Sequence, residues 1–123
     1  MKKFLVIGNP IEHSLSPLLH NYWIKNNSIK AIYEKKKLNE DQLEHLILEI
    51  RNKKINGINV TVPFKKAVIP FLDELSTEAQ NTRSVNTIYL KDNILMGHNT
   101  DIVGFEKSIK DSKYSLKNKE VLI

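Results

Sequence analysis

The chain has 123 residues and a formal net charge of +5 at pH 7, with 41% hydrophobic and 27% charged residues. This length and composition are typical of one globular domain with a real core. Because the sequence contains no cysteine, disulfides and thiolate metal sites are excluded, and no apolar run is long enough for a signal peptide or a membrane span. We therefore expect a cytoplasmic protein with no membrane partner.

The positive charge comes mainly from scattered lysines, because Arg51 and Arg83 are the only arginines. Recognition of phosphates and bases favours arginine, and no nucleic-acid-binding module is recognisable. We therefore expect a solvated, lysine-rich surface and no nucleic-acid partner. A positive field would also attract an anionic small molecule. None of the four histidines has a spacing typical of metal ligands, so no metal is expected.

The first predicted element is a buried strand over residues 4–7, followed by the turn GNPIEHSLSP at residues 8–17. Ser16 before Pro17 is typical of a helix start, with Ser as the N-cap and Pro in the first helical position. A helix N-terminus attracts anions, and the hydroxyls of Ser14 and Ser16 would complete a site for a carboxylate or phosphate. The alternative is that both serines only shape the turn and cap the helix.

A second strand is predicted from Ala31, and Asn39 precedes a helix with one apolar face. A helix broken at Pro70 follows later in the chain, and Thr77 with Gln80 fits a capping box for a further short helix. The apolar face of the helix after Asn39 consists of Leu43, Leu46, Ile47 and Ile50.

Residues 55–62 alternate between apolar and polar positions, and the pattern ends at Pro63, which indicates a strand. Asn59 and Thr61 are two residues apart and therefore share a face of that strand. Lys65 follows at the carboxyl end, where open α/β sheets place their ligands. Two neutral hydrogen-bonding groups and one proton carrier thus meet at one spot. The alternative is an ordinary strand end with a solvated lysine.

A β-hairpin is predicted next, with strands at residues 85–90 and 94–96 and a short loop between them. The second strand leads into a helix whose first turn contains Asp101. Aspartate is common at a helix start, but an aspartate that faces Lys65 across a cleft would be part of a site. Strands that alternate with helices predict a three-layer α/β sandwich with a mainly parallel mixed sheet.

Four motifs in this order resemble the amino-terminal, substrate-binding half of shikimate dehydrogenases, and the resemblance extends from about residue 4 to residue 105. The motifs are GNPIEHSLSP at 8–17, NVTVPFK at 59–65, VNT at 85–87 and NTD at 99–101. The resemblance implies reversible, NADPH-dependent reduction of 3-dehydroshikimate to shikimate, a step toward chorismate and the aromatic amino acids. A lysine ammonium at the ring ketone can stabilise the alkoxide left by hydride addition and supply its proton.

The resemblance also assigns roles to individual residues. Lys65 corresponds to the catalytic lysine and Asp101 to its catalytic partner. The residues implied to bind substrate are Ser14 and Ser16 at its carboxylate, and Asn59, Thr61, Lys65, Asn86 and Asp101 at its ring and hydroxyls. Thr77 stands where relatives often have an acidic residue near the nicotinamide, which makes Thr77 a candidate cofactor-binding residue.

The implied domain organisation is a shikimate/3-dehydroshikimate-binding catalytic domain over residues 1–110. Residues 111–123 would then be a linker and the first strand of a truncated, Rossmann-type NADP-binding domain. The four glycines of the chain form no Gly-x-Gly-x-x-Gly turn, so the sequence offers no cradle for the cofactor pyrophosphate. We expect the remaining NADP contacts to lie beyond Ile123 and the 123 residues to be inactive alone.

Two other functions fit the same motifs. One is a dehydrogenase that uses quinate, or both quinate and shikimate. The other is a non-catalytic regulator that senses shikimate, although the presence of both Lys65 and Asp101 favours an enzyme. Arg83 replaces a glycine that relatives usually have, and a positive φ at this position would be costly for arginine. The oligomeric state, monomer or homodimer, stays open.

Overall fold

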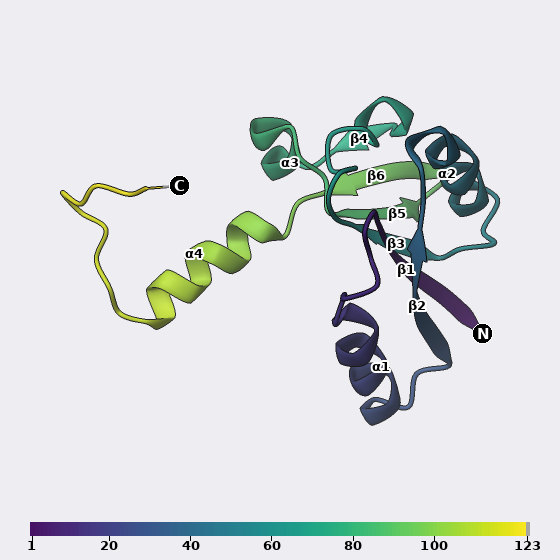
Figure 1. Cartoon of the computed structure of the whole chain (residues 1–123), viewed down its shortest axis with the longest axis horizontal. Coiled ribbons are helices and arrows are strands. Elements are labelled where there is room, and N and C mark those ends of the chain that lie inside the picture. The colour runs from purple at the N-terminus through teal and green to yellow at the C-terminus, as the bar shows by residue number, and fades with distance from the viewer. Residues whose placement is uncertain (123) are drawn as a thin grey trace.

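The computed structural model describes residues 1–122, and within them six strands form one mixed sheet in the order β2-β1-β3-β5-β6-β4 (Figure 1). β1 pairs in parallel with β2 and β3, and β4 pairs in parallel with β6, whereas β5 is antiparallel to β3 and β6. The predicted α/β fold with a mixed sheet is therefore confirmed. The strands are β1 Lys2–Gly8, β2 Ala31–Lys37, β3 Gly57–Val60, β4 Glu74–Leu75, β5 Thr87–Lys91 and β6 Ile94–His98.

Helices cover both faces of the sheet, because alternate residues of a strand point to opposite faces. Leu5 and Ile7 of β1 pack in the larger core cluster with α2, whereas Val6 packs in a smaller cluster against Ile24 of α1. The structure thus has the predicted three layers. The helices in the described residues are α1 Ser16–Asn26, α2 Leu43–Arg51, α3 Thr77–Thr82 and α4 Asp101–Asp111, with 3₁₀ turns at Glu40–Gln42 and Ile69–Phe71.

The apolar face predicted for α2 is confirmed, since Leu43, Leu46, Ile47 and Ile50 are all buried. At the end of α2, the Arg51 guanidinium forms two hydrogen bonds with the Asp73 carboxylate, at 2.9 and 3.1 Å. The same carboxylate accepts a hydrogen bond from the backbone N–H of Leu95 in β6, at 2.8 Å. These bonds, that of Arg51 above all, lower the pKa of Asp73 and connect α2 to the sheet.

β3 is shorter than the predicted strand because its two ends belong to turns. The backbone N–H of Ile55 donates to the Glu49 carbonyl of α2, and that of Phe64 donates to the Thr61 carbonyl. The helix expected around Pro70 is also reduced to the 3₁₀ turn Ile69–Phe71. The proline ring would clash with the carbonyl four residues earlier in an α-helix, so the segment after Lys65 does not continue as an α-helix through Pro70.

The cap of α3 lies one residue earlier than predicted. The Ser76 hydroxyl, not that of Thr77, accepts a hydrogen bond from the backbone N–H of Ala79, at 3.2 Å. The helix therefore begins at Thr77, the residue that was expected to be its N-cap. Serine with extended backbone geometry is a favourable N-cap, so the local chemistry is the one predicted but shifted by one position.

α4 begins at Asp101, as predicted, and leads away from the sheet (Figure 1). It buries none of its residues. The strand expected at the end of residues 111–123 is not formed in the described part of that segment, and Ile123 lies outside the described residues. None of the described helices is long and apolar enough to cross a membrane.

The ends of β1 and β3 approach each other closely at Gly8, and a substitution there tests this contact. A Cβ atom at Gly8 would lie 2.6 Å from Thr61 Cγ2 and 3.0 Å from the Val62 carbonyl oxygen. We expect Gly8→Ala to lower the free energy of unfolding by about 1–3 kcal/mol through overpacking. Gly104→Ala is the control, because a Cβ there meets no atom within 4 Å. It should raise helix stability by up to about 1 kcal/mol. Urea denaturation of both variants measures the difference, and equal stabilities would contradict this prediction.

Candidate active site

Four strand ends meet at one edge of the sheet and bring the predicted site residues together. β1 and β3 are parallel, so their carboxyl ends lie side by side. β5 is antiparallel to β3 and therefore begins at this edge, whereas β6, antiparallel to β5, ends there. Three segments follow β1, β3 and β6 at this edge, and a fourth precedes β5. Together they contain every residue predicted to bind substrate except Asn59, which lies within β3. This is the edge where α/β sheets place ligands.

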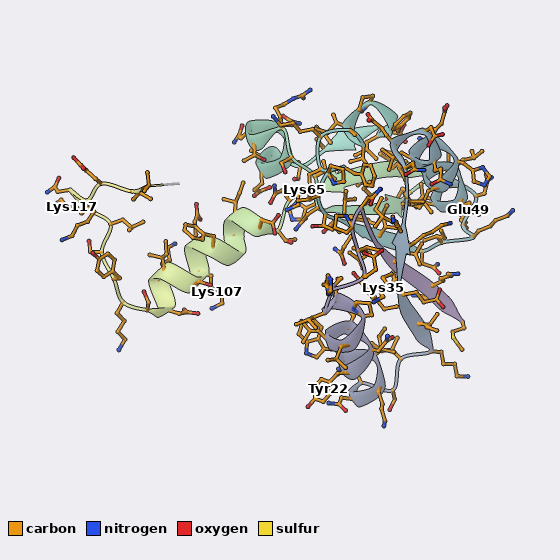
Figure 2. All side chains as sticks on the ribbon, viewed as in Figure 1. Tyr22, Lys35, Glu49, Lys65, Lys107 and Lys117 are labelled. Carbon is orange, nitrogen blue, oxygen red and sulfur yellow. The ribbon has the colours of Figure 1, made fainter. Side chains whose placement is uncertain are left out.

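Lys65 and Asp101 form an ion pair at this edge. Lys65 Nζ donates to Asp101 Oδ2 at 2.8 Å, and the two side chains are 34% and 52% exposed. Figure 2 shows Lys65 where α4 leaves the sheet. A partly exposed pair contributes little to folding stability, on the order of 0–1 kcal/mol, so its position at a cleft is the more informative fact. The structure therefore brings together the two residues that the resemblance implied as a catalytic pair.

The segment before β5 holds both partners of this ion pair. The backbone N–H of Val85 donates to the Lys65 carbonyl at 2.8 Å. The side chain of Asn86 bonds Thr100 twice: its Nδ2 donates to the Thr100 hydroxyl at 2.8 Å, and its Oδ1 accepts from the Thr100 N–H at 3.1 Å. Asn86 therefore fixes the residue next to Asp101 in addition to lining the cleft.

Asn99 is a site-supporting residue that sequence reasoning missed. Its side chain is buried, with Oδ1 accepting from the N–H groups of Asp101 at 2.8 Å and Ile102 at 3.4 Å. Its Nδ2 donates to the Ser84 carbonyl at 3.0 Å and the Thr82 hydroxyl at 3.4 Å. Asn99, one residue before the N-cap position Thr100, thus caps the first free N–H groups of α4 with its side chain and connects α4 to the end of α3.

The two predicted carboxylate-binding serines lie at the start of α1. The structure corrects their structural roles: Ser16 is the first helical residue, and Leu15 occupies the N-cap without a side-chain bond. The Ser14 hydroxyl accepts from the Ser16 N–H at 3.3 Å, so Ser14 is the residue that satisfies a free backbone donor. The first turn of α1 contains no acidic residue to offset the positive end of the helix dipole.

Asn59 lines the cleft, but protein groups already occupy both ends of its amide. Its Oδ1 accepts from the Tyr33 hydroxyl at 2.8 Å, and its Nδ2 donates to the Asn86 carbonyl and the Thr87 hydroxyl, each at 3.2 Å. Burial raises the pKa of Tyr33 to about 12, although a hydrogen bond with Ser16 acts in the opposite direction. Tyr33 therefore stays protonated at neutral pH and donates to Asn59.

His20 of α1 also lines the cleft, although its sequence position suggested no role. Its ring stacks on Tyr33, with centroids 4.1 Å apart and planes 3° from parallel. Burial lowers the pKa of His20, so the ring is neutral at pH 7. His20 and Tyr33 come from elements that no local motif connects, which is why the sequence alone did not place them together.

The cleft has a volume of about 250 Å³ and adjoins a second cavity of about 260 Å³ at the start of α1. Ser16, Thr61 and Val6 line both cavities, whereas Ser14 lines only the second. The cleft is lined by Val6, Ser16, His20, Asn59, Val60, Thr61, Lys65, Asn86 and Asp101.

Two residues singled out in the sequence lie elsewhere. Thr77 is the exposed first residue of α3 and lines neither cavity. Arg83 is exposed at the end of α3 with φ 52° and ψ 40°, in the left-handed region. The positive φ at this glycine-like position is thus present, and arginine there carries a conformational cost. Within residues 1–122, no group of three or more potential metal ligands is assembled.

Fold and cleft define an α/β ligand-binding domain with an ion pair at the carboxyl edge of its sheet. The sequence profile of the shikimate dehydrogenase substrate binding domain matches residues 6–88. The chain therefore belongs to the shikimate dehydrogenase family and represents its substrate-binding domain.

Individual relatives agree with this assignment. The chain is 60% identical over 122 residues to the shikimate dehydrogenase (NADP(+)) of Pelagibacter ubique, covering 99% of this chain and 46% of the relative. The shikimate 5-dehydrogenase of Thermus thermophilus in complex with shikimate superposes with a TM-score of 0.88 at 35% identity, covering 96% and 45%. A structure of the Thermus enzyme with NADP(H) and shikimate gives a TM-score of 0.86 at 34% identity, covering 94% and 44%. The chain thus spans about half the length of these relatives.

Asn99 provides a test of how α4 is held. Asn99→Ala removes the cap of α4, worth about 1 kcal/mol, and leaves the Ser84 carbonyl without its donor, at a further cost of about 1–3 kcal/mol. We expect a total loss of roughly 2–4 kcal/mol in the free energy of unfolding, measured by chemical denaturation. Asn26→Ala, at the exposed end of α1, is the control and should change little. Similar stabilities for the two variants would show that Asn99 does not hold α4.

Proposed function

We propose that this domain binds shikimate and 3-dehydroshikimate and that the polypeptide containing it is an NADP-dependent shikimate dehydrogenase. The observation that carries the proposal is the ion pair of Lys65 and Asp101, 2.8 Å apart, in a cleft that Ser16 also lines. A purely sensing protein has no need of a proton carrier at this position. The arrangement of a cation, an anion and neutral hydrogen-bonding groups in this cleft suits a small polyhydroxylated acid.

The proposed reaction is hydride transfer to or from a ring carbon of the substrate. NADPH, when bound, supplies the hydride, and the ketone oxygen becomes an alkoxide. Lys65 would stabilise the negative charge on that oxygen and deliver a proton to it, and would accept the proton in the reverse direction. Asp101 orients the Lys65 ammonium through their hydrogen bond and can accept one from a ring hydroxyl.

The substrate carboxylate would bind at the start of α1, away from the reacting carbon. Ser14 and Ser16 offer two hydroxyls next to a helix N-terminus with no acidic residue in its first turn. Holding the carboxylate there would orient the ring toward Lys65, since the two cavities adjoin through Ser16 and Thr61. Thr61, Asn59 and Asn86 would line the path of the ring, with Asn59 acting mainly through its own hydrogen bonds to the protein.

The domain organisation is part of the same proposal. Residues 1–110 would form the substrate-binding catalytic domain, and residues 111–123 would lead into an NADP-binding domain. The end of α4 at Asp111 is in keeping with a boundary there. Thr77 stays a candidate contact for the cofactor, because it is exposed and lies outside the substrate cavities.

Lys65→Met in the complete polypeptide tests the chemical step. Methionine keeps an apolar stem of similar length but cannot supply a proton, so kcat should fall by about 10²–10⁴-fold with a much smaller change in shikimate affinity. Steady-state kinetics and equilibrium binding measure the two effects separately. Lys66→Met is the matched control, because Lys66 is exposed and does not line the cleft. Near-normal turnover by Lys65→Met would refute the role of Lys65 and favour a shikimate sensor.

Replacement of both serines tests the carboxylate site. Each hydrogen bond to a charged group is worth roughly 1.5–3 kcal/mol, so Ser14→Ala with Ser16→Ala should raise the KM for shikimate at least tenfold and leave the KM for NADP unchanged. Ser14→Ala alone should also cost some stability, because its hydroxyl accepts from the Ser16 N–H. Ser108→Ala, on the exposed side of α4, is the control. Unchanged shikimate binding by the double variant would place the carboxylate elsewhere.

A further inference from the structure

Asn21 of α1 makes an unusual contact with the edge of the sheet. Its Nδ2 donates to the Tyr33 carbonyl at 2.8 Å, and its Oδ1 accepts from the Tyr33 N–H at 3.0 Å. Tyr33 lies in β2, which is an edge strand. One side-chain amide therefore supplies both hydrogen bonds that a neighbouring strand would otherwise make at this residue.

α1 has few other attachments. It buries no residue, and Leu18 is 74% exposed. Tyr22, shown on α1 in Figure 2, is 61% exposed. An open groove of about 500 Å³, lined on the helix side by His20 and Ile24, separates part of α1 from the sheet. Apolar contacts across such a groove leave a helix free to tilt or slide, whereas two directional hydrogen bonds to one backbone residue do not.

The position of α1 matters because its first residue lines the cleft. Ser16 is five residues before Asn21, about 7.5 Å along the helix axis. The backbone of Tyr33 holds α1, and the hydroxyl of Tyr33 holds Asn59 at 2.8 Å. Asn59 in turn donates to the carbonyl of Asn86, a residue of the segment that holds Lys65 and Asp101. One tyrosine thus links the helix with the serines to the strands with the ion pair.

We propose that Asn21 is a positioning residue for substrate binding. By holding α1 against β2, Asn21 sets the distance between the serines at the start of α1 and the ion pair of Lys65 and Asp101. The inference rests on the proposed function, because it concerns the same substrate. Asn21 does not line the cleft itself and acts through the placement of α1.

Three substitutions in the complete polypeptide test this role. Asn21→Ala removes both hydrogen bonds, and Asn21→Asp sets a carboxylate against the Tyr33 carbonyl. Asn21→Gln keeps the amide but can retain both bonds only if the helix moves outward by about one methylene. All three should raise the KM for shikimate, roughly three- to tenfold for Asn21→Ala, with kcat changed less than about twofold and the KM for NADP unchanged.

Asn27→Ala is the matched control. Asn27 is at the other end of α1 and donates to the Trp23 carbonyl at 2.8 Å, so its loss weakens the helix without releasing it from β2. It should leave the KM for shikimate unchanged. If Asn21→Ala does not fold, as judged by circular dichroism, the gentler Asn21→Gln decides, and a normal KM for that folded variant overturns the proposal.

A double-mutant cycle separates positioning from general destabilisation. In the background of Ser14→Ala with Ser16→Ala, Asn21→Ala should have no further effect on KM, because the groups that it positions are gone. An equal effect of Asn21→Ala in both backgrounds would show that it acts by another route. Failure of the unaltered protein to bind shikimate would instead contradict the proposed function, so the two failures are distinguishable.

Discussion

Three consecutive residues, Ser84, Val85 and Asn86, hold the two halves of the proposed catalytic pair in place. The Val85 N–H binds the carbonyl of Lys65, and the Asn86 side chain binds Thr100, the residue before Asp101. The Ser84 carbonyl accepts from Asn99, which caps α4. Lys65 and Asp101 are 36 residues apart in the chain, and their ion pair depends on this common support.

Hydrogen bonds between segments that are distant in the sequence also hold the other side of the cleft in place. β1 and β3 bring the loop with the serines beside Thr61, and Tyr33 connects α1 to Asn59. Among the described residues, no buried side-chain nitrogen or oxygen lacks a hydrogen-bond partner. A polar cleft in which the supporting groups are already bonded to one another is preorganised, so little rearrangement would be needed when a substrate binds.

Local patterns predicted much of the fold and part of the site. The apolar face of α2, the hairpin of β5 and β6 and the start of α4 at Asp101 follow from periodicity and turn chemistry. The pairing of Lys65 with Asp101 was implied by the resemblance to shikimate dehydrogenases, and the structure brings the two side chains together. The errors were also local: a hydroxyl cap was assigned to Ser16 instead of Ser14, and a helix broken at Pro70 was expected where the chain forms only a 3₁₀ turn.

Supporting residues could not be predicted because their partners are distant in the sequence. Asn21 and Tyr33 are 12 residues apart, Tyr33 and Asn59 are 26 apart, and Asn99 and Ser84 are 15 apart. An asparagine on a helix or before one has many ordinary interpretations, and only the packed structure shows which backbone groups it meets. The sequence therefore indicates the groups that would touch a ligand more readily than those that hold them.

The most direct test of the account is a crystal structure of the complete polypeptide with shikimate bound. The account predicts the carboxylate of shikimate within hydrogen-bond distance of the Ser14 and Ser16 hydroxyls, and a ring hydroxyl between Lys65 Nζ and the Asp101 carboxylate. A shikimate molecule bound with its carboxylate at Lys65, or in a different cavity, would contradict the central claim that the start of α1 orients the ring toward the ion pair.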